Sequence, residues 1–151
     1  MSKLIPKWLI WAIVAVAFLG FIDASYLTLV HYMGAELGCT EWGSCNEVTT
    51  SEYSVIFGIP MALMGALYYL AVLILALVYI DTKWKFPLKL IPIATTFGFL
   101  FSLGLIYLQL FVIHAICLYC MFSAGTSTIL FILSMIYLFT RPSEQVDKLQ
   151  V

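Results

Sequence analysis

The chain is dominated by apolar stretches that are each long enough to cross a lipid bilayer. Its 151 residues are 64% hydrophobic and only 10% charged, and the mean hydropathy is +1.06. Because the hydrocarbon core of a bilayer takes about 20 apolar residues per helix, we predict four spans, at about 8–30, 56–80, 88–113 and 116–139. The predicted fold is an all-α integral membrane protein, a four-helix bundle that forms a single domain over 1–151.

The basic residues indicate how these spans are oriented. In the four-span prediction all seven fall on one side of the membrane: Lys3, Lys7, Lys83, Lys85, Lys89, Arg141 and Lys148. Since Lys and Arg near span ends stay on the cytoplasmic side, we predict a multi-pass protein of the cytoplasmic (inner) membrane with both termini in the cytoplasm. The loop at about 31–55 and the turn near 113–116 are then extracytoplasmic. The net charge of −1 gives no reason to expect nucleic acid as a partner.

All four cysteines fall at this predicted outer face. Cys39 and Cys45 lie in the loop, and Cys117 and Cys120 form a Cys-x-x-Cys where the fourth span begins. Thiols near a helix N-terminus are favoured as thiolates, the form that attacks disulfides and electrophiles. Passing a disulfide by thiol exchange requires two neighbouring cysteine pairs. Here one pair is fixed at a helix end and the other lies on a glycine-containing loop.

Two structural alternatives compete with this relay. Both pairs could be inert disulfides of a non-catalytic membrane protein, since outward-facing loops often carry such bridges. A zinc site made of the four cysteines is a weaker alternative, because the spacing fits poorly and the compartment is oxidising, so no metal is expected. The Cys-x-x-Cys motif favours redox chemistry over both.

Small side chains follow Cys120 and leave room for a flat ring. Ala124 and Ser127 continue the same helix face, with Ser123 and Gly125 alongside. A lipid-soluble quinone is the electrophile that reaches a thiol from within the membrane, although small residues also serve helix packing. Gln109 in the third span is a candidate hydrogen-bond partner of a quinone carbonyl, with interhelical packing as the alternative.

Three ionisable residues are candidates for proton handling during quinone reduction. Asp23 lies inside the outer half of the first span, where an ionisable group marks a functional site by default. His31 and His114 fall at the outer boundary, and histidine is the side chain best suited to exchange protons near neutral pH. A hydrogen-bonded helix contact for Asp23 and interfacial anchoring for the histidines are the alternatives.

Further residues complete a recognisable pattern. Besides the Cys-x5-Cys followed by the Cys-x-x-Cys, the chain carries Ala24-Ser25-Tyr26-Leu27-Thr28, Ser51 and Phe57-Gly58-Ile59-Pro60. In these features it resembles the vitamin K epoxide reductase family in its compact prokaryotic form. The DsbB family also has four spans and two cysteine pairs, but there the Cys-x-x-Cys comes in the first outer loop.

The resemblance implies a quinone-dependent thiol-disulfide oxidoreductase that supports disulfide formation in exported proteins. A separate thioredoxin-like or DsbA-like protein would give electrons to Cys39, Cys45 would pass them to Cys117, and Cys120 would face the quinone. The implied acceptor is ubiquinone, menaquinone or a vitamin K-like quinone. Direct reduction of a quinone epoxide stays open as an alternative.

The resemblance also implies the residues that contact the quinone. Ser54 falls at the family position of a polar quinone-orienting side chain, three residues before Phe57. Ala124 stands where animal members carry a tyrosine. We therefore expect Ser54, Phe57, Gln109 and Ala124 to form the quinone site.

Overall fold

Four long helices make up the body of the protein. The structure, a computed structural model, describes residues 7–34, 52–82 and 85–140. Within these ranges four segments are long and apolar enough to cross a membrane: α1 (Lys7–Met33), α3 (Met61–Thr82), α4 (Lys85–Tyr107) with the π-helical turn Leu108–Ile113 that continues it, and α5 (Leu118–Thr140). The predicted all-α membrane bundle is confirmed.

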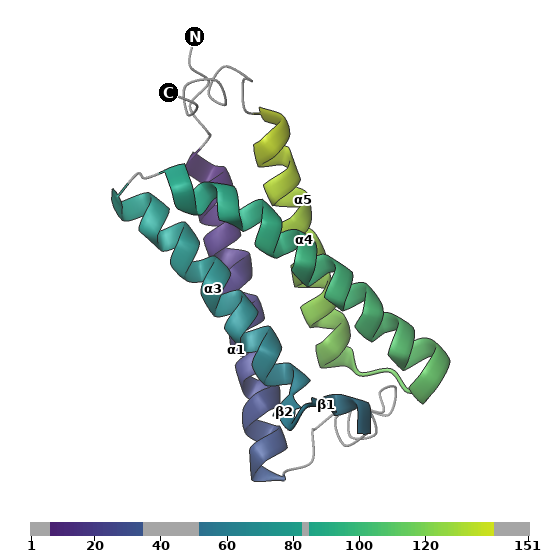
Figure 1. The fold of residues 1–151 in the computed structure, drawn as a ribbon. Coiled ribbons are helices and arrows are strands. Elements are labelled where there is room, and N and C mark those ends of the chain that lie inside the picture. The colour runs from purple at the N-terminus through teal and green to yellow at the C-terminus, as the bar shows by residue number, and fades with distance from the viewer. Residues whose placement is uncertain (1–6, 35–51, 83–84, 141–151) are drawn as a thin grey trace.

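The helices form a closed ring in which each packs mainly on two neighbours, in the order α1, α3, α4, α5. Figure 1 shows that α1 begins and α5 ends at the same end of the bundle. The other end carries the connection between α4 and α5 and a short antiparallel hairpin, in which β1 (Val55–Ile56) pairs with β2 (Ile59–Pro60). We call this the hairpin end of the bundle.

The hairpin corrects the predicted start of the second span at residue 56. The helix begins only at Met61, because Phe57 and Gly58 have φ angles of 53° and 80° that a right-handed helix does not allow. Positive φ at both central residues is what a tight two-residue hairpin turn requires. Pro60 therefore ends the hairpin, and the helix begins at the next residue.

The other span boundaries differ from the prediction by at most three residues. The predicted turn near 113–116 is observed at 114–117. There the π-helical turn ends at His114, whose left-handed backbone (φ 55°, ψ 30°) stops the helix. The chain then re-enters helical structure at Leu118.

Apolar side chains cover the outside of the bundle as well as its interior. Phe18, Leu29, Ile74 and Ile132 are 51%, 55%, 50% and 51% exposed on the bundle's outer surface. Such a surface suits lipid, which is as apolar as the side chains themselves. The interior, by contrast, contains hydroxyl groups that join helices.

Two glycines allow adjacent tyrosines of α3 to extend sideways in the bundle. A Cβ atom on Gly20 of α1 would lie 2.3 Å from Tyr69 Cε1, and one on Gly98 of α4 would lie 2.3 Å from Tyr68 Cζ. The two rings therefore rest against different helices, with their centroids 5.0 Å apart. Tyr69 reaches further, to α5, where its hydroxyl donates to the Ser123 carbonyl oxygen at 2.6 Å.

Candidate functional site

The Cys-x-x-Cys pair lies at the hairpin end of the bundle, where α5 begins. Cys117 immediately precedes the helix and is fully buried, whereas Cys120 in the first turn is partly exposed, and both are free thiols. The backbone N–H of Cys120 donates to Cys117 Sγ over 3.4 Å. Cys117 thus takes the N-cap position, with sulfur in the place of the usual capping oxygen.

This contact favours the thiolate form of Cys117. The hydrogen bond from the Cys120 thiol, with further bonds from the backbone N–H groups of Cys120 and Tyr119, lowers the pKa of Cys117 to about 7. Burial and the nearby Asp23 act in the opposite direction but are outweighed. In the reduced pair, Cys117 is therefore the stronger nucleophile and Cys120 the hydrogen-bond donor.

Gln109 braces the segment that leads into the pair. Its side-chain Oε1 accepts a hydrogen bond from the Cys117 N–H at 3.3 Å, and its backbone carbonyl accepts one from the Ala115 N–H at 3.1 Å. The π-helical turn places Gln109 on the buried side of the chain, directly opposite the start of α5. Gln109 thus holds the start of α5 in place, and its predicted contact with a quinone stays a prediction.

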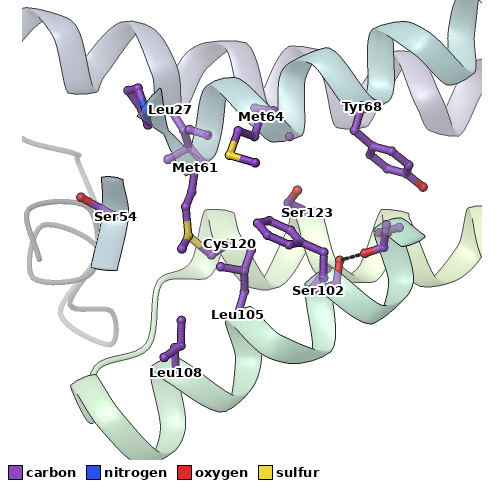
Figure 2. A pocket seen from close by; sticks show the side chains of 18 of the residues that line it. Leu27, Ser54, Met61, Met64, Tyr68, Ser102, Leu105, Leu108, Cys120 and Ser123 are labelled. Carbon is purple, nitrogen blue, oxygen red and sulfur yellow. Dashed lines mark hydrogen bonds between the residues drawn. The ribbon is translucent and has the colours of Figure 1, made fainter. Parts of the chain in front are cut away.

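A cavity of about 350 Å³ opens beside Cys120. One wall comes from α5, with Cys120, Ser123, Ala124 and Ser127, and the remaining walls come from the other helices and the hairpin. Figure 2 shows Ser54 at one end of the cavity and Tyr68 at the other, with Cys120 and Ser123 between them. A mostly apolar cavity of this size with a few polar groups is typical of small-molecule sites, which measure about 300–1,000 Å³.

Three of the four predicted quinone contacts line this cavity. Ser54, Gln109 and Ala124 do so, whereas Phe57 does not. The side chain of Phe57 is 100% exposed, because the residue stands at the tip of the hairpin turn. The prediction for Phe57 is wrong in this respect, and Pro60 is the hairpin residue that lines the cavity instead.

The three proton-handling candidates are not brought together. His31 lines the cavity, while His114 is exposed at the turn between α4 and α5 and lies apart from it. Asp23 is buried in α1, and its Oδ2 has no hydrogen-bond partner in the described part of the chain. It lies close enough to Tyr69 for an electrostatic interaction. Only His31 is therefore placed to meet a ligand directly.

Cys39 and Cys45, predicted to form the loop pair, lie outside the described residues, as does Ser51. Across residues 7–34, 52–82 and 85–140, no group of three or more His, Cys, Asp or Glu side chains is arranged to hold a metal ion.

Other cavity residues were not predicted from the sequence. Tyr68 and Tyr69 of α3 both line the cavity, and their signal in the sequence was two hydroxyl-bearing side chains inside an apolar span. Tyr26, part of the first-span motif, contributes indirectly: its ring packs at a tilt of 43° against that of Tyr119, the residue before Cys120, with the ring centroids 5.5 Å apart. The motif in α1 thus packs against the segment that carries the redox pair.

Comparison with known proteins agrees with this geometry. A model of the Vitamin K epoxide reductase family matches residues 11–135, which is most of the chain. The chain belongs to this family. It is also similar to Thiol-disulfide oxidoreductase LTO1 of Arabidopsis thaliana, with 29% identity over 138 residues, covering 86% of this chain and 37% of the relative. This vitamin K epoxide reductase family member therefore spans well under half the length of that relative, and the two matches support a thiol-disulfide redox role.

Proposed function

We propose that this protein is a quinone-reducing thiol-disulfide oxidoreductase whose Cys117–Cys120 dithiol is oxidised by a quinone in the cavity. One observation carries the proposal: the two sulfurs are unequal in their access to the cavity. Cys120 lines it, whereas Cys117 is fully buried behind Cys120 and is not among the lining residues. A membrane-embedded cavity that meets one thiol of a redox pair is suited to a lipid-soluble electron acceptor.

The residues present fit such an acceptor. Ser54 offers a hydroxyl at one end of the cavity, and Ala124 leaves space on the α5 wall beside Cys120. A quinone bound here would accept the two electrons and two protons that the dithiol releases when its disulfide forms, and would leave as the hydroquinone. Cys117, favoured as thiolate, supplies the electron pair of the new sulfur–sulfur bond, and Cys120 provides the sulfur that faces the acceptor.

Electrons would reach the pair through the loop cysteines. Cys39 would take them from a thioredoxin-like or DsbA-like partner, and Cys45 would pass them to Cys117, so that the partner leaves oxidised and able to form disulfides in exported proteins. The reaction would take place on the extracytoplasmic side. Lys7 and Lys89 support this orientation, because both lie near helix starts at the end of the bundle opposite the cysteines.

The test compares Cys120→Ser with Cys117→Ser, both supplied with a reduced thioredoxin-like partner and a ubiquinone analogue under anaerobic conditions. Neither variant should reduce the quinone, as followed by its absorbance. Only Cys120→Ser should accumulate a Cys45–Cys117 disulfide, detected by mass spectrometry of non-reduced peptides, because Cys117 can still attack but has no partner to resolve it. Quinone reduction at the normal rate by Cys120→Ser would overturn the assignment, and a wild-type protein without quinone reduction would point to structural disulfides.

A further inference from the structure

Two hydroxyl groups in the cavity wall are buried without hydrogen bonds. Tyr68 Oη on α3 and Ser127 Oγ on α5 are both shielded from solvent, and neither has a hydrogen-bond partner within the described ranges. Ser127 is only 2% exposed. Because burying a polar atom without a partner costs free energy, such atoms are uncommon and call for an explanation.

The neighbouring Tyr69 shows what a structural hydroxyl looks like in this bundle. Its Oη donates to the Ser123 carbonyl oxygen at 2.6 Å and lies 3.1 Å from Ser123 Oγ and 2.8 Å from Thr126 Oγ1. Tyr68, in contrast, rests its ring on α4 at Gly98, and its hydroxyl lies near enough to that of Ser127 for the two to interact, yet neither makes a hydrogen bond of ordinary geometry. The hydroxyl of Tyr69 is therefore satisfied within the protein, whereas that of Tyr68 is not.

The unpartnered pair lies at a defined place relative to the thiol. Ser127 follows Cys120 by seven residues, which is two helical turns or about 10 Å along α5. Ala124 lies between them on the same wall and leaves the space open. Since Ser54 and Tyr68 are at opposite ends of the cavity with Cys120 between them, a ring held against Cys120 would have hydroxyl groups beyond both of its edges (Figure 2).

We propose that Tyr68 and Ser127 form a subsite that receives the second carbonyl oxygen of a para-quinone whose ring lies against Cys120. The inference rests on the proposed function and assigns the residues that hold the carbonyl at the far side of the ring. Each hydroxyl can donate one hydrogen bond, and a carbonyl oxygen can accept two. Ligand binding would thus satisfy both groups that folding leaves unpaired.

The experiment measures binding rather than turnover, using the full chain carrying Cys120→Ser in detergent. Isothermal titration calorimetry would compare dimethylnaphthoquinone, whose reactive ring positions are blocked, with dimethylchromone, in which a ring oxygen replaces one carbonyl. Tyr68→Phe and Ser127→Ala should each raise the Kd for the naphthoquinone by roughly three- to tenfold, the loss expected for one neutral hydrogen bond. The chromone should be affected much less, because it can turn its single carbonyl towards the Ser54 end.

Ser134→Ala is the matched control for Ser127→Ala, because Ser134 lies two turns further along α5, is fully buried and does not line the cavity. It should lower the melting temperature, since its contacts with Thr95 Oγ1 and the Phe131 carbonyl oxygen are lost, but it should leave the ratio of the two Kd values unchanged. Tyr68→Phe should keep or raise the melting temperature. The subsite would be overturned if Tyr68→Phe and Ser127→Ala weakened the binding of both ligands equally, or if both left the naphthoquinone Kd unchanged. Either result would leave quinone binding itself intact. A protein that binds neither ligand would instead remove the proposed function itself.

Discussion

Replacing Gln109 by Met tests the brace that holds Cys117 at the start of α5. The substitution keeps the length of the side chain but removes the oxygen that accepts the Cys117 N–H at 3.3 Å. Gln109 is 3% exposed and Cys117 is 0% exposed, so water cannot readily replace the lost acceptor. An unsatisfied buried N–H costs about 1–3 kcal/mol, and side-chain hydrogen bonds in membrane proteins fall near the lower end of such ranges. We therefore expect the free energy of unfolding to fall by about 1–2 kcal/mol.

The assay is reversible unfolding in mixed micelles with increasing sodium dodecyl sulfate, followed by circular dichroism. Leu110→Met serves as the control, because it makes the same residue at the next position, where the side chain is 46% exposed and carries no hydrogen bond. The control should unfold like the wild-type protein. If Gln109→Met is equally stable, the Cys117 N–H does not depend on Gln109, and the bracing role is wrong.

Two further predictions concern packing and ionisation. Gly20→Ala places a Cβ 2.3 Å from Tyr69 Cε1 and should lower the free energy of unfolding by about 1–3 kcal/mol in the same unfolding assay. Gly125→Ala is the control: its Cβ meets nothing within 4 Å, so the change should be neutral or slightly stabilising. In reduced protein lacking the two loop cysteines, thiolate absorbance in the ultraviolet should rise with pH around a midpoint near the Cys117 pKa of about 7, and Cys120→Ala should move that midpoint upward, because the donor thiol is lost. A midpoint unchanged by Cys120→Ala would contradict the hydrogen-bond explanation.

The helical spans were predictable because crossing a membrane depends on the length of an apolar run, which can be counted directly in the sequence. The hairpin before α3 was not. Ile56 begins the apolar run, and the left-handed backbone at Phe57 and Gly58 separates this residue from the helix. Gly58 and Pro60 were the available signals for a turn, but both residues count little in a hydropathy average.

The site was predictable only in part, for a similar reason. The position of Cys117 and Cys120 at a helix N-terminus follows from local sequence, but the walls of the cavity depend on which helices become neighbours. Tyr68 reaches the cavity because Gly98 of α4 leaves room for its ring, and no pattern within α3 alone reports that contact. Gln109 likewise gains its role from the start of α5, eight residues further along the chain.

The most direct test of quinone reduction by Cys117 and Cys120 uses a variant in which Cys39 and Cys45 are replaced by Ser, so that these two are the remaining thiols of the chain. The protein is reduced, freed of reductant and mixed anaerobically with excess ubiquinone or menaquinone analogue, and hydroquinone and free thiols are counted together. We expect one hydroquinone per protein molecule and a Cys117–Cys120 disulfide in the product. Two thiols that stay reduced in the presence of excess quinone would contradict this expectation.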